Sequence, residues 1–169
     1  MQSPIRVMIV DENEERAALI EAGIAAGGCE VVARLVGRAD LRDKVNEIQP
    51  DVIIVDMDCP DRDTLEDMSH LNRHQPRPTV MWVDRSDSES IRAAVQAGVS
   101  AYVVGGLSPE RVRSVIVETA DADDSNTILL VTHDIRAAIA TADHLLILGK
   151  RPDEGGAVIR GSYEQGGCP

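Results

Sequence analysis

Carboxylates follow two of the apolar segments of this sequence. Asp11 and Glu12 come directly after residues 5–10, and Asp56 closes residues 51–56. If these segments are neighbouring strands of a parallel sheet, their carboxyl ends bring the three side chains to one edge. Carboxylates about 5 Å apart repel by about 3 kcal/mol at an effective dielectric constant of about 20, so the cluster favours a hard divalent cation such as Mg²⁺ or a raised pKa. The alternative is that these acids cap helices or line a solvated rim.

The elements that would position these acids are visible as alternating segments. Short Val/Ile-rich runs alternate with stretches whose apolar residues recur at helical spacing. The runs are continuous rather than alternating, which is typical of a parallel sheet covered on both faces. We therefore predict a doubly wound α/β fold of the flavodoxin-like type, with strand order 2-1-3-4-5. Its five strands are expected at residues 5–10, 29–35, 51–56, 79–83 and 101–104.

The last third of the chain predicts an extension of this domain. An acidic segment at residues 121–126 indicates a linker after a domain of residues 1–120. A strand–helix–strand (βαβ) extension is expected over residues 127–161, and a loose, Gly-rich tail over residues 162–169. The expected elements are a strand at 127–132, a helix with apolar residues from 135 to 142, a strand at 144–148 and a short strand at 157–159.

Composition excludes several classes of protein. The chain has 169 residues and a formal net charge of −12, and aromatic residues make up 2% of it. This balance argues against nucleic-acid binding, which needs basic and stacking side chains, and favours cationic partners or divalent metals. No apolar run approaches the roughly 18–20 residues of a membrane helix, and no secretory signal is visible. The three cysteines form no CxxC pattern and are typical of reduced thiols, so we expect a cytoplasmic protein.

Several segments together resemble the receiver domains of response regulators. The segment 51–60, DVIIVDMDCP, resembles their phosphoacceptor strand and loop, and 7–12, VMIVDE, resembles their metal-binding acidic pair. The segment 97–104, AGVSAYVV, resembles their fifth strand. More narrowly, this last segment together with 75–82, QPRPTVMW, is similar to the AmiR/NasT antitermination regulators. The resemblance covers residues ~5–119.

The resemblance implies roles for individual residues. Asp56 matches the phosphorylated aspartate, Asp11 the principal Mg²⁺ ligand with Glu12 assisting, and the backbone carbonyl of Asp58 the third metal contact. The implied reaction is attack by the Asp56 carboxylate on a phosphohistidine or a small phosphodonor, assisted by Mg²⁺. The implied partner is a sensor histidine kinase or a sequestering sensor protein. The implied regulatory system is that of nitrate or nitrogen.

Two positions depart from the receiver pattern. Receivers carry Thr or Ser where this chain has Val83, and Lys where it has Gly105. The resemblance implies that this hydroxyl normally bonds the phosphoryl group and moves together with the aromatic residue of the fifth strand. Tyr102 keeps the aromatic position here, but the hydroxyl that would be its partner is missing. Asp84 adds negative charge at the same mouth. These departures keep a second function open, a phosphorylation-independent protein-interaction module.

The output region of an AmiR/NasT regulator is missing. Neither a coiled coil nor a three-helix RNA-binding pattern follows residue 120. Instead, residues ~126–161 resemble the switch-histidine segment of nitrate/taurine-type ABC transporter ATPases, with His133 at the histidine position. The chain has no GxxxxGK[ST] phosphate loop, so a nucleotide-binding fragment remains only a weak alternative and we expect no enzyme. The appended strands could extend the receiver sheet or favour a homodimer.

Overall fold

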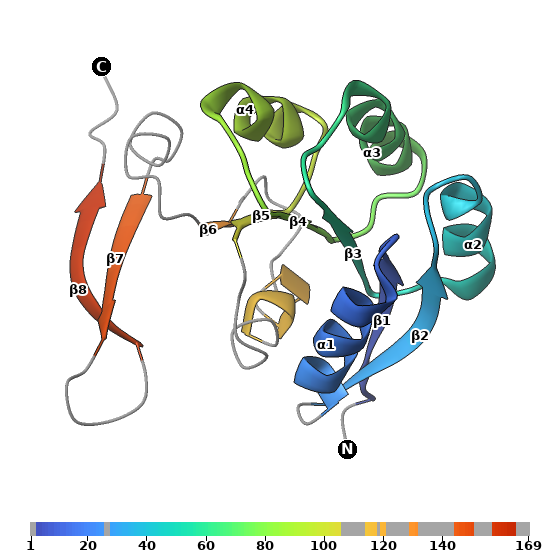
Figure 1. The fold of residues 1–169 in the computed structure, drawn as a ribbon, viewed down its shortest axis with the longest axis horizontal. Helices are drawn as coiled ribbons and strands as arrows, with labels where there is room; N and C mark the ends of the chain where they lie inside the picture. The colour runs from blue at the N-terminus through green and yellow to red at the C-terminus, as the bar shows by residue number, and fades with distance from the viewer. Residues whose placement is uncertain are drawn as a thin grey trace. The chain divides into compact units, whose positions relative to one another are not determined.

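The strands form two separate sheets. The structure, a computed structural model, describes residues 3–25, 28–105, 114–117, 119–120, 129–131, 144–150 and 157–164. One sheet has six strands in the order β2-β1-β3-β4-β5-β6, and the other consists of β7 and β8 (Figure 1). The strands are β1 (Ile5–Val10), β2 (Cys29–Leu35), β3 (Val52–Met57), β4 (Thr79–Val83), β5 (Ala101–Val104), β6 (Leu129–Val131), β7 (His144–Lys150) and β8 (Ala157–Glu164).

The first five strands confirm the predicted fold class. Every neighbouring pair in the larger sheet is parallel, and the order 2-1-3-4-5 is that of a flavodoxin-like fold. The third strand lies one residue later than the sequence indicated, at Val52–Met57. The labelled helices between these strands are α1 (Glu14–Ala25), α2 (Leu41–Ile48), α3 (Arg62–His74) and α4 (Ser88–Gln96).

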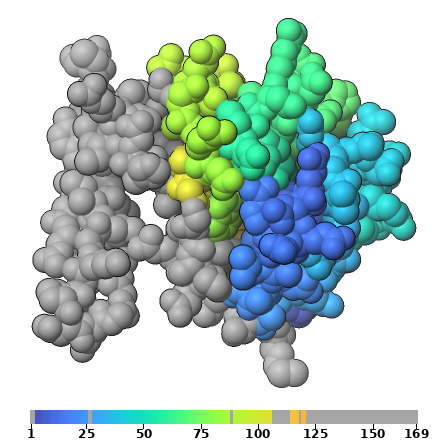
Figure 2. Space-filling model, viewed as in Figure 1, coloured from blue at the N-terminus to red at the C-terminus, as the bar shows by residue number. Residues whose placement is uncertain are grey.

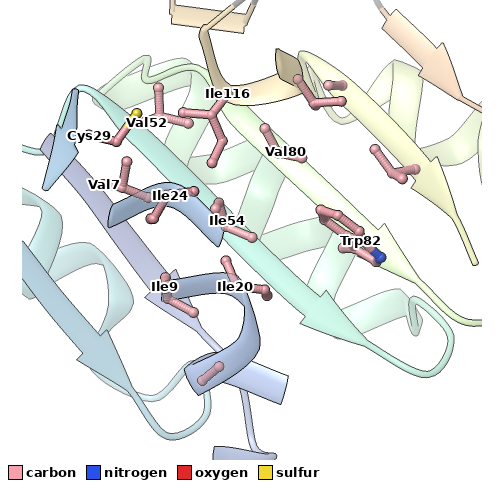
Figure 3. Packing of buried hydrophobic residues seen from close by; sticks show 14 residues of the cluster. Val7, Ile9, Ile20, Ile24, Cys29, Val52, Ile54, Val80, Trp82 and Ile116 are labelled. Atoms are coloured by element: carbon pink, nitrogen blue, oxygen red, sulfur yellow. The ribbon is translucent and has the colours of Figure 1, made fainter. Parts of the chain in front are cut away.

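Apolar side chains cover both faces of the larger sheet. The helix α1 and the helical residues 114–117 and 119–120 lie over one face, while α2, α3 and α4 lie over the other (Figure 1). Because side chains alternate along a strand, Val7, Ile9, Val52 and Ile54 all point to the α1 face, where they belong to one buried cluster with Ile20 and Ile24 (Figure 3). In the space-filling view, the residues of α1, shown in blue, lie directly against those of the following β-α units (Figure 2).

Polar residues in the loops begin the helices. The Asp61 carboxylate accepts a hydrogen bond from the backbone N–H of Thr64 at the start of α3, and Asp87 does the same for Ser90 in α4, both at 2.7 Å. The side chain of Asn13 accepts hydrogen bonds from the backbone at the start of α1. These side chains are N-caps, which satisfy amide groups that have no partner within the helix.

The C-terminal strands differ in part from the expected extension. The strand β6 pairs in parallel with β5 and so extends the larger sheet beyond the fifth strand. The strand β7, however, pairs antiparallel with β8 instead of joining β6 in a βαβ unit. A parallel pair needs a long crossover, whereas the short segment 151–156 is sufficient for an antiparallel pair. The strand β8 also reaches Glu164, which corrects the expected start of a loose tail at residue 162.

The domain boundaries stay a prediction. Contacts divide the chain into one unit of Met1–Val131 and another of Thr132–Pro169. The predicted linker at 121–126, the predicted helix from 135 to 142 and His133 all lie outside the described residues. Within the described residues, no helix has the length and apolar character needed to cross a membrane.

Candidate functional site

The alternation of side chains along the strands brings two buried acids together. Asp11 follows Val7 and Ile9 at two-residue intervals, and Asp56 follows Val52 and Ile54 in the same way. Since Ile9 is the register partner of Ile54, both acids lie at the carboxyl edge of the sheet on the face that α1 covers. The predicted convergence of the ends of β1 and β3 is therefore what the structure contains.

These acids border a cavity of about 400 Å³. Asp11 is 4% exposed and Asp56 is 7% exposed, whereas Glu12 is an exposed residue on the cavity wall. Asp58, in the loop after β3, lines the same cavity and its side chain is exposed. The cavity thus combines two desolvated carboxylates at its floor with three solvated ones, those of Glu12, Asp58 and Asp61. The cavity is lined by Val10, Asp11, Glu12, Asn13, Arg16, Gly37, Arg38, Val55, Asp56, Met57, Asp58, Cys59, Asp61 and Thr64.

A basic residue that the sequence analysis did not single out lies at the centre of this cluster. The Arg16 guanidinium is 3.5 Å from Asp56 Oδ2 through Nε and 3.5 Å from Asp11 Oδ1 through Nη2. Its Nη1 donates hydrogen bonds of 3.1 Å to Asp58 and to Asp84. One cation is therefore shared by four carboxylates.

A signal for Arg16 was present in the sequence. It is the only basic residue of α1, and it lies in the first turn of that helix beside Glu14 and Glu15. A positive charge near a helix N-terminus is unfavourable towards the helix dipole, so a basic residue there needs an acidic partner elsewhere. The spacing alone could not name that partner.

Two oxygens of the buried pair still lack partners. Among the residues that the structure describes, Asp11 Oδ2 and Asp56 Oδ1 are buried and make no hydrogen bond. Buried carboxylate oxygens without donors are costly unless a cation or a donor reaches them. Carboxylate oxygens are also the ligands that Mg²⁺ prefers, so Asp11 and Asp56 fit such an ion.

The electrostatic surroundings act strongly on Asp56. Burial raises the pKa of Asp56, the neighbouring Asp11 charge raises it further, and Arg16 lowers it, leaving a pKa of about 7. Burial lowers the pKa of Arg16, but the Asp56 charge and the hydrogen bond to Asp58 raise it above its ordinary value. The arginine is therefore charged at neutral pH, while Asp56 ionises more readily when a further cation is present.

Comparison with known proteins identifies the family. Residues 7–117 match the response regulator receiver domain. The chain belongs to the receiver domain family. Part of the receiver domain is 31% identical over 90 residues to a protein-glutamate methylesterase/protein-glutamine glutaminase of Halobacterium salinarum, a match that covers 53% of this chain and 26% of the relative. A related methylesterase/glutaminase of Myxococcus xanthus is 36% identical over 104 residues, covering 60% and 30%.

Solved receiver domains have the same fold. The signal receiver domain of NarL from Mycobacterium tuberculosis superposes with a TM-score of 0.66 at 14% identity, covering 72% of this chain and 100% of that one. The response regulator domain of Thermotoga maritima CheB gives a TM-score of 0.58 at 19% identity, covering 71% and 98%. The matched region is thus the receiver part of the methylesterases, and the chain spans about a quarter to a third of the length of these two relatives.

At its switch positions, the receiver domain contains a hydrogen bond that the sequence analysis did not predict. Val83 and Tyr102 are fully buried, and Val83 has no hydroxyl to offer. The Tyr102 hydroxyl nevertheless has a partner, because it lies 2.7 Å from the hydroxyl of Ser86 in the loop after β4. The expected hydroxyl at position 83 is thus absent, and Ser86, three positions beyond Val83, supplies a different hydroxyl partner.

Gly105, at the position where receivers carry lysine, has a left-handed backbone conformation. Gly105 has a φ of 85°, in the left-handed region that favours glycine. Its carbonyl accepts a hydrogen bond of 3.0 Å from Trp82 Nε1, which ties the end of β5 to β4. Replacing the usual lysine by glycine in this receiver domain is therefore accompanied by a conformation that a lysine adopts only with strain.

Metal ligation in this receiver domain would depend on few side chains. In the described part of the chain, no three His, Cys, Asp or Glu side chains are arranged as a metal site. A site built on Asp11 and Asp56 would need a carbonyl or water as its next ligand. The Asp58 carbonyl is placed in the cavity loop, where it accepts a hydrogen bond of 3.2 Å from the backbone of Arg85 and has a second lone pair.

Proposed function

We propose that this receiver domain is a phosphoacceptor in which Asp56 takes up a phosphoryl group with the help of Mg²⁺. The observation that carries the proposal is the state of Asp56. This residue is almost fully buried, yet it borders an open cavity, and its Oδ1 makes no hydrogen bond within the described residues. A largely desolvated carboxylate that borders an open cavity is a competent nucleophile once it is ionised.

In the proposed reaction, an oxygen of the Asp56 carboxylate attacks the phosphorus of a phosphohistidine or a small phosphodonor. An oxygen–phosphorus bond forms, the phosphorus–nitrogen or phosphorus–oxygen bond of the donor breaks, and the leaving group keeps the electron pair. The product is an acyl phosphate on Asp56. Asp11, Asp56 and the carbonyl of Asp58 would hold Mg²⁺, with exposed Glu12 assisting at the rim. When bound, Mg²⁺ neutralises charge on the transferred phosphoryl oxygens.

A second function is favoured by specific residues. Val83 offers no hydroxyl, and Gly105 offers no cation, to a phosphoryl group on Asp56. A pocket without these two groups would hold the product less well. The alternative proposal is therefore a receiver that binds a protein partner without being phosphorylated.

The finer assignments rest on sequence resemblance. We propose an AmiR/NasT-type receiver that acts in the cytoplasm in nitrate or nitrogen regulation, as a homodimer, with a sensor histidine kinase or a sequestering sensor protein as partner. The acidic composition supports the expectation that this chain alone does not bind nucleic acid. The resemblance of residues ~126–161 to an ABC ATPase segment supports at most a nucleotide-binding fragment.

The decisive experiment is intact-mass analysis after incubation with Mg²⁺ and acetyl phosphate. A working phosphoacceptor gains one phosphoryl group, about 80 Da by simple atomic mass, and Asp56→Asn does not. The exposed Asp51→Asn variant is the control for nonspecific labelling, because Asp51 lies at the opposite, amino-terminal end of β3. A folded wild-type protein without the adduct, and without a thermal shift on adding beryllofluoride and Mg²⁺, would support the phosphorylation-independent module instead.

A further inference from the structure

We propose that Arg16 is a resident counter-ion of the acidic cavity, which a divalent cation must displace from Asp11 and Asp56 before it can bind. Arg16 would then set the Mg²⁺ concentration at which the cavity is loaded. This inference builds on the metal binding in the proposed function and adds a competing residue to it.

The contacts of Arg16 fall into two kinds. The outer contacts, from Nη1 to Asp58 and Asp84, are hydrogen bonds of 3.1 Å to exposed carboxylates. The inner contacts, to Asp11 and Asp56, are ion pairs of 3.5 Å. Within the described structure, the Nε that faces Asp56 donates no hydrogen bond. The guanidinium is thus anchored at the rim and only loosely held at the floor.

The floor of the cavity has carboxylate oxygens that these loose contacts leave without partners. Asp11 and Asp56 are more than nine-tenths buried, and in the part of the chain that is described each has one oxygen without a hydrogen-bond partner. One positive charge does not neutralise four carboxylates. The unpartnered oxygens point to a ligand that the guanidinium does not replace, and a small cation of higher charge density fits them.

Arg16 and a divalent cation cannot share the floor without cost. Both positive charges would lie within about 4–5 Å of each other, where like charges repel strongly in a partly desolvated site. Arg16 can move, because its side chain is 27% exposed and extends from the first turn of α1. A shift that breaks the inner ion pairs and keeps the outer hydrogen bonds would admit the cation.

The test is calorimetric titration of Mg²⁺ into the metal-free chain of 169 residues. In Arg16→Gln the competing charge is absent, so we expect the Mg²⁺ dissociation constant to fall by at least about tenfold. The matched control is Arg38→Gln. Arg38 lines the same cavity and is similarly exposed, but its ion pairs are with Asp61 and Asp67, and its variant should bind Mg²⁺ as the wild type does.

Thermal unfolding gives a second readout that does not depend on phosphorylation. In EDTA, Arg16→Gln should melt below the wild type, because it leaves the carboxylates uncompensated, and saturating Mg²⁺ should raise its melting temperature by more than that of the wild type. Arg16→Lys, which keeps the charge but cannot span four carboxylates, should lie between the two.

The outcomes separate this inference from the proposed function. Equal or weaker Mg²⁺ binding by Arg16→Gln overturns the inference, even if acetyl phosphate labels Asp56. Tighter binding by Arg16→Gln supports it, even if Asp56 is never phosphorylated. If neither protein binds Mg²⁺ while both remain folded, the competition does not exist and the inference is wrong.

Discussion

The hydroxyl of Tyr102 lies 2.7 Å from the hydroxyl of Ser86. Tyr102 is fully buried in β5, and Ser86 belongs to the loop that follows β4 beside the acidic cavity. A buried phenol needs such a partner, because an unpaired buried hydroxyl costs about 1–3 kcal/mol. The bond therefore joins the loop after β4 to β5. Receivers normally place a Thr or Ser hydroxyl in this region, at the position that Val83 occupies here.

Removing the Ser86 hydroxyl should destabilise the domain measurably. We expect Ser86→Ala to lower the free energy of unfolding by about 1–2 kcal/mol, since Tyr102 is left unpaired. Tyr102→Phe removes the other partner, and Ser86→Ala should then cost much less in that background. Urea unfolding of the two single variants and the double variant measures the coupling. Additive effects would mean that the hydrogen bond contributes nothing to stability.

The raised pKa of Asp56 makes stability depend on pH. Its pKa rises from an ordinary value of 3.8 to about 7 on folding, mainly through burial, so the folded state binds the proton more tightly than the unfolded state. The stability that protonated Asp56 contributes is present below the unfolded pKa and is lost as the pH rises through about 7. The benefit of Asp56→Asn, in EDTA, should therefore be about 2–3 kcal/mol larger at pH 8 than at pH 5.

Urea unfolding at the two pH values measures this difference. The control is Glu30→Gln, which changes an exposed carboxylate at the amino-terminal end of β2, whereas the cavity lies at the carboxyl ends of the strands. A benefit of Asp56→Asn that is the same at both pH values would contradict an Asp56 that titrates near neutrality.

Restoring the lysine that receivers normally carry should lower the stability of this domain. Gly105→Lys places a side chain on a residue with φ of 85°, and we expect it to cost about 1–2 kcal/mol of stability. Space is not the obstacle, since a Cβ at Gly105 would meet no atom of the described structure within 4 Å. The measurement is urea unfolding, with Gly105→Asn as the matched variant, because Asn tolerates the left-handed region and should cost less. Equal losses for the two variants would exclude backbone strain as the cause.

The N-cap of α4 gives a prediction that does not involve the acids of the cavity floor. Asp87→Ala should lower the urea concentration at the unfolding midpoint, because it removes the side chain that accepts from the Ser90 amide. These hydrogen bonds also lower the pKa of Asp87, so the stabilisation should be present near neutral pH and disappear as the pH falls through the acidic range. Asp87→Asn keeps the cap without the charge and should remove only the pH dependence. Urea unfolding at neutral and acidic pH separates the two variants.

The acids of this protein divide into two groups that the sequence left unresolved. The sequence allowed Asp11, Asp56 and Glu12 to be metal ligands or helix caps. In the structure, the caps of α3 and α4 are Asp61 and Asp87, while Asp11 and Asp56 meet at the cavity floor. Asp11 and Asp56 lie at the carboxyl ends of β1 and β3, whereas Asp61 and Asp87 directly precede α3 and α4.

The sequence by itself determined that the first five strands form a parallel sheet, and it predicted the convergence of Asp11 with Asp56. Those features follow from local periodicity and from the rule that parallel strands present their carboxyl ends at one edge. Tertiary structure decided that Arg16 joins the acids, although Asp58 and Asp84 lie 42 and 68 positions away in the sequence. It also decided that β7 pairs with β8 and that Ser86 reaches Tyr102. The physical reason is the same in each case, because side-chain partners depend on how helices and loops pack on the sheet, which no local pattern encodes.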